Sequence, residues 1–259
     1  FGFIEIGTVT PRPQLGNDKP RLFRLKEDNA LINRMGFNND GVDVIVERLK
    51  KRHANIILGG NIGKNKNTNN DLASKDYIEC LHKIAPHVDY LVLNISSPNT
   101  PNLVQLQNKD QLESLLSDVQ SVNQHQYKKP ILIKISPDLN FSQIDDVLDL
   151  VKKFEISGVI ATNTSSNRNN LKTPQHITSK KGRGGISGQP IHSRAKEVVS
   201  YIHNKTGGRV PIVAVGGVMT ALDAESMLKS GASLVQIYTG FIYKGPGLVK
   251  SINHFLLTS

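Results

Sequence analysis

Short apolar runs alternate along the whole chain with stretches in which apolar residues recur every three or four positions. The runs indicate strands, and the one-sided stretches indicate helices that cover a sheet. Seven strands are predicted, at residues 3–9, 55–61, 90–96, 131–136, 158–162, 211–216 and 234–239. Helical spacing lies between them, at residues 42–49, 112–119, 144–151 and 195–202. The pattern is typical of repeated strand–helix units around a parallel sheet.

The strand interiors are apolar at nearly every position, as in YLVLN, ILIKI and IVAVG. Such strands are buried on both faces, which favours a barrel or a doubly wound sheet over a sandwich. Because composition shows no break, we predict a single domain over residues 1–259 with an α/β fold, a TIM (β/α)8 barrel. Seven strands are one fewer than that barrel contains, so its first strand is expected upstream of Phe1.

Local signals refine this outline. Residues 162–190 are rich in Asn, Ser, Lys and Gly and are long for a loop, so they are predicted to form a lid or to be disordered. Ser142 is followed three positions later by Asp145, a spacing typical of a helix N-terminal cap. Thr220 and Asp223 repeat that spacing and predict a second cap.

Charge and composition limit the possible partners. Lys and Arg total 32 against 22 Asp and Glu, so a net charge of +10 favours anionic ligands or surfaces. Aromatic residues are 5% with no Trp, so the stacking platforms of single-strand binders are absent and no nucleic-acid partner is expected. Cys80 is the single cysteine and the histidines form no HExxH pair, so neither a disulfide nor a metal site is expected. No apolar run reaches the roughly 18 residues that span a bilayer.

Polar residues stand where the predicted strands end, which is where barrels of this kind carry their sites. They are Thr8, Asn61, Asn94, Ser97, Thr162, Asn163, Thr164, Gly216, Gly217, Tyr238 and Thr239. Any one of them could simply close its own turn. Lys134 differs, because it lies inside the apolar run ILIKI and needs an anionic or acceptor partner. Gly216-Gly217 and the glycine cluster at residues 184–188 could offer backbone N–H groups to a phosphate.

A series of motifs follows one order along the chain, most of them at predicted strand ends. They are EIGTVTPRPQ, RLFRL, INRMGFNN, GNIGKNK, NISSPNTP, KISPDL, TNTS, GGISG, VGGV and VQIYTGFIYKGP. In these motifs, and over essentially its whole length, the chain resembles the class 2, quinone-dependent dihydroorotate dehydrogenases, FMN enzymes of pyrimidine biosynthesis. The resemblance implies oxidation of (S)-dihydroorotate to orotate, with FMN as hydride acceptor and a membrane quinone as final acceptor.

The resemblance also implies roles for individual residues. The catalytic base would be Ser97; class 1 relatives carry Cys there, whereas Cys80 lies outside the motif. Residues that would hold dihydroorotate or orotate are Asn33, Arg34, Met35, Gly36, Phe37, Asn94, Asn99, Asn163 and Thr164. Residues that would surround FMN are Thr8, Asn61, Asn94, Lys134, Thr162, Gly188, Gly217, Tyr238 and Thr239. Asn side chains both donate and accept hydrogen bonds, which suits a pyrimidine with alternating carbonyl and N–H groups.

Partners and location follow from the resemblance alone. The quinone would bind through helices upstream of Phe1, which the family uses for peripheral membrane association. The expected location is the cytoplasmic side of a bacterial inner membrane, with the mitochondrial inner membrane as the alternative. Two other interpretations stay open: the chain could be an inactive fragment of such an enzyme, or another FMN barrel oxidoreductase that acts on a different pyrimidine.

Overall fold

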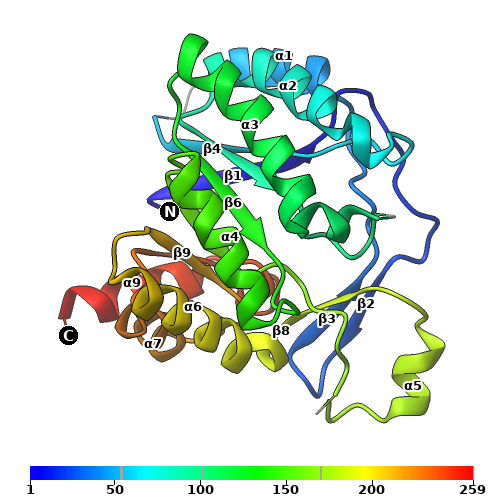
Figure 1. The fold of residues 1–259 in the computed structure, drawn as a ribbon. Coiled ribbons are helices and arrows are strands. Elements are labelled where there is room, and N and C mark those ends of the chain that lie inside the picture. Colours follow the sequence, from blue (N-terminus) through cyan, green and yellow to red (C-terminus); the bar gives the residue numbers. More distant parts are fainter. Residues whose placement is uncertain (53–54, 101, 170, 259) are drawn as a thin grey trace.

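A computed structural model describes residues 1–52, 55–100, 102–169 and 171–258, and its centre is a seven-stranded parallel sheet (Figure 1). The strands are β1 (Phe3–Val9), β4 (Ile57–Ile62), β5 (Tyr90–Asn94), β6 (Ile131–Ile135), β7 (Gly158–Ala161), β9 (Ile212–Val215) and β10 (Leu234–Gln236). Their order in the sheet follows their order along the chain, and every neighbouring pair is parallel. The seven predicted strands and the barrel-like fold are confirmed.

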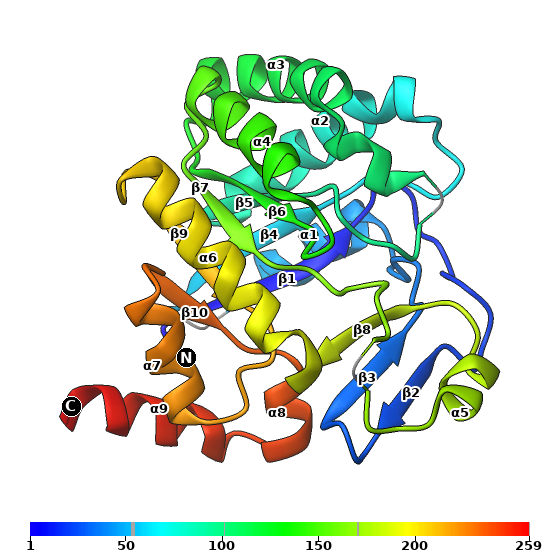
Figure 2. The same ribbon diagram turned by 60° about the horizontal axis from the view of Figure 1, so that its bottom comes forward.

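Helices follow most of these strands and cover the outer face of the curled sheet (Figures 1 and 2). They are α1 (Val42–Lys50), α2 (Ala73–Ile84), α3 (Lys109–Gln126), α4 (Phe141–Lys153), α6 (His192–Thr206), α7 (Ala221–Lys229), α8 (Thr239–Lys244) and α9 (Gly247–Thr258). The helices predicted from spacing, α1, α3, α4 and α6, are confirmed, and their apolar stripes join the main core. Helix α2 was not predicted; it buries Tyr77, Cys80 and Leu81.

Side chains alternate between the two faces of each strand, and this alternation divides the core in two. In β6, Ile131, Ile133 and Ile135 belong to the large cluster that packs under the helices. Leu132 packs against a second cluster, inside the curled sheet, formed by Val92, Ile160, Val213 and Val215. Because Lys134 lies two positions after Leu132, its side chain also points into the interior.

A second, three-stranded antiparallel sheet lies beside the main one (Figure 2). Its strands are β2 (Leu22–Leu25), β3 (Ala30–Asn33) and β8 (Gly185–Gly188), and a short helix, α5 (Gln175–Lys180), precedes β8. Since β8 and α5 fall within residues 162–190, the expectation of disorder there is wrong at both elements. Four-residue strands are too short to show a period, and β8 pairs with β3 from much earlier in the chain. Ile32 and Ile186 pair across the two strands and anchor a small core of their own.

One of the two predicted helix caps is wrong. The N-cap of α4 is Asn140, whose side chain accepts from the Gln143 backbone N–H at 2.9 Å while the Gln143 side chain accepts from the Asn140 N–H at 3.0 Å. Ser142 lies inside the first turn, so its hydroxyl does not cap the helix. The second cap is confirmed, since the Thr220 hydroxyl accepts from the Asp223 N–H at 3.1 Å.

The role of Asn140 as the N-cap of α4 can be tested by its contribution to stability. Asn140→Ala is expected to lower the free energy of unfolding by about 1 kcal/mol, because it removes the acceptor of the capping box. Ser142→Ala is the matched control and is expected to stay within about 0.5 kcal/mol of the parent. Denaturant titration of both variants measures the difference, and equal losses would contradict the assignment of the cap.

Candidate active site

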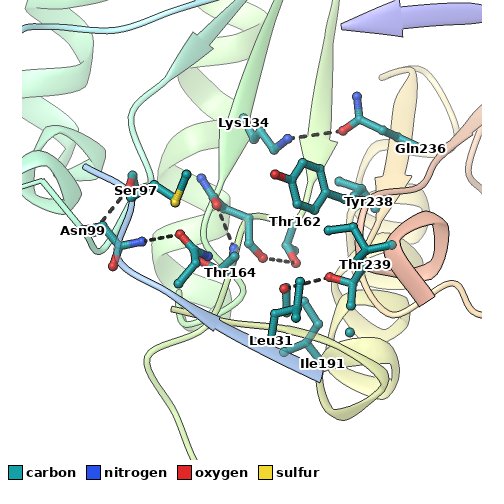
Figure 3. Close-up of a pocket in the computed structure, with 18 of the residues that line it drawn as sticks. Leu31, Ser97, Asn99, Lys134, Thr162, Thr164, Ile191, Gln236, Tyr238 and Thr239 are labelled. Carbon is teal, nitrogen blue, oxygen red and sulfur yellow. Dashed lines mark hydrogen bonds between the residues drawn. The ribbon is translucent and has the colours of Figure 1, made fainter. Parts of the chain in front are cut away.

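The carboxyl ends of the main-sheet strands and the small sheet enclose a cavity of about 340 Å³ (Figure 3). All the residues that the sequence analysis assigned to substrate, cofactor or catalysis line it, except Arg34 and Asn61. The lining residues among them are Thr8, Asn33, Met35, Gly36, Phe37, Asn94, Ser97, Asn99, Lys134, Thr162, Asn163, Thr164, Gly188, Gly217, Tyr238 and Thr239. The fold therefore brings motifs from the whole length of the chain to one place.

The two exceptions point elsewhere. The guanidinium group of Arg34 donates to the carbonyl oxygens of Lys181, Arg183 and Pro20, so it braces the segment before β8 rather than facing the cavity. Asn61 lines a second cavity of about 430 Å³ that adjoins the first. There its side chain accepts from the Thr8 hydroxyl at 2.7 Å.

A row of side-chain amides crosses the floor of the site. Asn163 donates to the Asn94 side-chain oxygen at 3.1 Å, and Asn94 donates to the Thr8 hydroxyl at 2.8 Å. Across the cavity, Asn99 donates to the Asn33 side-chain oxygen at 3.0 Å. Each amide keeps further donor or acceptor capacity, so the cavity offers both kinds of group to a small polar ligand.

Helix α2 fixes the backbone at Asn94 from outside the sheet. The Tyr77 hydroxyl is buried and donates to the Asn94 carbonyl oxygen at 2.9 Å. Burial raises the pKa of Tyr77 well above its ordinary value, so the hydroxyl stays protonated and remains a donor. The end of β5 is therefore held by a tyrosine that the sequence analysis did not single out.

Two side chains that the sequence analysis did not name hold the loop after β3 from behind. Gln14 donates to the carbonyl oxygens of Gly36 at 3.0 Å and Phe37 at 3.1 Å. Asn17 donates to the carbonyl oxygens of Arg34 at 3.0 Å and Asn99 at 3.1 Å, joining two loops that line the cavity. Gln14 is the last residue of the EIGTVTPRPQ motif and Asn17 lies three positions after it, but contacts with such distant residues leave no local pattern in the sequence.

Ser97 follows β5 at the cavity wall and is buried. Its hydroxyl oxygen accepts from the Asn99 backbone N–H at 3.3 Å (Figure 3). Within the described residues, no carboxylate or imidazole makes a hydrogen bond to it. The hydroxyl proton is therefore free to point into the cavity.

Two glycine turns face each other at the other side of the cavity. Gly217, after β9, has φ +66°, and Gly188, at the end of β8, has φ +100°. A Cβ atom at Gly217 would lie 2.7 Å from the Gly188 carbonyl oxygen, so a side chain does not fit there. Over the described ranges, the backbone N–H groups of Gly217 and Val218 donate to no protein group. Such turns can bind a phosphate through their N–H groups.

The Thr164 hydroxyl is buried and has no hydrogen-bond partner within the part of the chain that the structure describes. The backbone of Gly185 closes over it, and a Cβ atom there would lie 2.1 Å from the Thr164 oxygen. A buried hydroxyl left unpaired costs about 1–3 kcal/mol. A ligand in the cavity would supply the missing partner.

Lys134 lies where the two cavities meet, with its side chain 16% exposed. Its ammonium group donates to the Gln236 side-chain oxygen at 3.2 Å, and the nearest Glu5 carboxylate oxygen is 3.7 Å away. The expectation that this lysine needs an anionic or acceptor partner is confirmed. Figure 3 shows its side chain pointing toward Gln236.

Fold and site together define an α/β-barrel protein whose cavity suits a phosphate-bearing cofactor and a small polar ligand. Residues 1–258 match the family model of dihydroorotate dehydrogenase. The dihydroorotate dehydrogenase (quinone) of Christiangramia forsetii is 52% identical over 258 residues, which are 99% of this chain and 74% of that protein. The protein of the same name from Pseudoalteromonas translucida is 50% identical over 97% of this chain and 76% of its own length.

Solved structures agree with the sequence comparison. The crystal structure of DHODH from Eimeria tenella in complex with ferulenol superposes with a TM-score of 0.90 at 39% identity, over 100% of this chain and 74% of that one. The ligand-free form of that protein gives a TM-score of 0.89 at 39% identity, over 98% and 76% of the two chains. The chain belongs to the dihydroorotate dehydrogenase family.

Neither a membrane-spanning helix nor a cluster of metal ligands occurs in the described residues. No described helix is both long and apolar enough to span a bilayer. No group of three or more His, Cys, Asp or Glu side chains in residues 1–52, 55–100, 102–169 and 171–258 is placed to hold a metal ion.

The bracing of the substrate-side loop can be tested directly. Gln14→Leu removes both donors to the Gly36 and Phe37 carbonyl oxygens, so backbone amides of residues 33–38 are expected to exchange with deuterium at least severalfold faster. Gln124→Leu is the control, because that exposed glutamine of α3 makes a single 3.4 Å contact. Hydrogen exchange followed by mass spectrometry measures both variants. Unchanged exchange in Gln14→Leu would show that other contacts hold the loop.

Proposed function

We propose that this chain oxidises (S)-dihydroorotate to orotate in pyrimidine biosynthesis, with FMN as hydride acceptor and a quinone as the final electron acceptor. The observation that carries the proposal is the cavity itself. In a chain of the dihydroorotate dehydrogenase family, this cavity brings together Ser97, the row of side-chain amides, Lys134 and the two glycine turns. Residues 1–259 would act as a single FMN-binding domain.

The residues present fit FMN. The N–H groups of Gly217 and Val218, beside Gly188, would hold the phosphate group. The other side chains that would surround FMN are Thr8, Asn61, Asn94, Lys134, Thr162, Tyr238 and Thr239. When bound, FMN supplies the hydride acceptor for the reaction. Lys134 would stabilise the negative charge that accumulates on reduction.

Substrate would lie against the row of side-chain amides on the floor of the site. Side chains and loop residues proposed to hold its ring and carboxylate are Asn33, Met35, Gly36, Phe37, Asn94, Asn99, Asn163 and Thr164. The buried Thr164 hydroxyl would gain the partner it lacks. Arg34 would not contact the substrate and would instead hold the segment that precedes β8 in place.

Ser97 would serve as the base. As hydride passes from the carbon that bears the substrate carboxylate to the flavin, the Ser97 oxygen would receive the proton released from the neighbouring ring carbon. A serine hydroxyl is a weak base unaided, and no acidic or imidazole side chain of the described chain bonds to it. The proton would therefore pass onward through water or neighbouring hydroxyl groups.

The proposal extends to the acceptor and the location. The two relatives described above carry quinone in their names and come from bacteria, which supports peripheral association with a bacterial inner membrane on its cytoplasmic side. At the edge of the cavity, Leu22, Tyr238 and Ile242 are exposed apolar or aromatic side chains suited to an apolar quinone. A region preceding Phe1 would complete the quinone site and the membrane contact.

The first test is anaerobic absorbance of the purified chain before and after addition of dihydroorotate. A yellow protein that bleaches is expected, since bleaching reports reduction of bound flavin. Repeating the measurement with the upstream coding segment restored separates two causes of failure. Bleaching in the longer protein alone would mean that this chain is an inactive piece of the enzyme, and failure in both would refute the proposed function.

Ser97→Ala tests the base. The variant is expected to keep its flavin but to be reduced by dihydroorotate about 100-fold or more slowly, because a positioned base contributes rate in that range. Ser193→Ala, at an exposed position of α6, is the control. Stopped-flow absorbance measures both rates. Reduction of Ser97→Ala at the parent rate would remove this serine from the mechanism.

A further inference from the structure

Glu5 is a carboxylate within β1 with little exposed surface, and the proposed function assigns it no role. Its side chain is 9% exposed. Among the described side chains that line the two cavities, Glu5 is the one carboxylate and Lys134 the one cation. A charge with so little exposed surface is stable only where it is paired and hydrogen-bonded.

Glu5 is well bonded. One of its oxygens accepts from the Asn61 side chain at 2.8 Å and the other accepts from the Gln236 side chain at 2.9 Å. Gln236 in turn accepts from Lys134, whose ammonium nitrogen is 3.7 Å from Glu5. Three strands, β4, β10 and β6, thus direct donors or charge at this one carboxylate.

Glu5 is also the end point of the amide row. Asn163 donates to Asn94, Asn94 to Thr8, Thr8 to Asn61, and Asn61 to Glu5. A carboxylate can only accept, so it fixes the direction of every bond in this series. The same acceptor therefore orients the amides on one side and holds the lysine on the other.

We propose that Glu5 is the positioning residue and counter-charge of Lys134, and that it lowers the reduction potential of the bound flavin. The inference rests on the proposed function, because it takes the flavin to lie beside Lys134. A free ammonium group stabilises the charge that a flavin acquires on reduction. A carboxylate 3.7 Å from that nitrogen offsets much of its field, since a close ion pair acts at a distance as a dipole rather than as a charge.

A purely structural role for Glu5 makes a different prediction. The Glu5–Gln236 bond joins β1 to β10, the two edge strands of the main sheet. If closing that gap were its whole purpose, loss of the carboxylate would lower stability and leave the flavin potential unchanged. The flavin potential therefore distinguishes the two roles.

The decisive variant is Glu5→Gln in the FMN-loaded enzyme. Glutamine keeps the size of the side chain and an acceptor for Asn61, so the variant loses the charge and the acceptor for Gln236. We expect the two-electron reduction potential of the flavin to become more positive by about 30 mV. At a fixed potential of the solution, this shift raises the ratio of reduced to oxidised flavin about tenfold. Anaerobic spectroscopic titration against a reference dye measures it. Glu5→Asp, which withdraws the carboxylate by one methylene, is expected to shift the potential in the same direction by less.

Two comparisons complete the design. Asp145→Asn removes a carboxylate that pairs with Lys205 at 2.9 Å on the outer helices, so it changes the net charge equally and should leave the potential unchanged. Adding Lys134→Met to Glu5→Gln removes both charges of the pair, so the potential should return from the Glu5→Gln value toward that of the parent, because the two charges offset each other at the flavin.

The outcomes are separable from those of the proposed function. A parent protein that binds no flavin, even with the upstream segment restored, would refute the proposed function. With flavin bound to the parent, an unchanged or more negative potential in Glu5→Gln would overturn the role of Glu5. A double variant whose potential stays as positive as that of Glu5→Gln would overturn its pairing with Lys134. If Glu5→Gln fails to fold, an unchanged potential in Glu5→Asp is the overturning result.

Discussion

The alternation of side chains on parallel strands is the constraint on which the rest of this structure depends. Inward positions near the start of a strand are apolar, as at Phe3 and Leu132, and the inward positions two residues further on are polar, as at Glu5 and Lys134. Parallel register aligns these polar positions across neighbouring strands, with Asn94 beside Lys134. The apolar inward side chains near the strand starts fill the interior of the curled sheet, and the polar inward side chains two residues further on form the floor of the site.

A buried polar layer is stable only if its members satisfy one another. Here the amides of Asn163, Asn94 and Asn61 form a directed series that ends on Glu5. The same network that satisfies the floor also orients the groups that a pyrimidine would meet. Stability and ligand recognition therefore depend on one set of hydrogen bonds.

The small antiparallel sheet supplies the opposite wall. Asp28, in the turn between β2 and β3, accepts from the backbone N–H groups of Lys172 at 2.6 Å and Thr173 at 3.1 Å. These bonds fasten the segment after β7 to a hairpin from the beginning of the chain, and β8 then pairs with β3. The wall is built from distant segments, and its glycines leave room for backbone to approach a ligand.

The seven strands, four of the helices and the parallel sheet could be predicted from the periodicity of apolar residues alone. Burial on both faces of a strand and an apolar stripe along a helix are local properties, so the sequence shows them directly. Motif resemblance supplied Ser97 and most of the cavity lining. Tertiary structure decided what depends on distant partners. It turned Arg34 away from the cavity, placed β8 in a sheet, and showed Gln14 and Asn17 behind the loops. Glu5 differs again, because an acid two positions after an inward Phe is visible in the sequence. Its two hydrogen bonds and its ion pair come from three other strands, and only the folded chain brings those strands together.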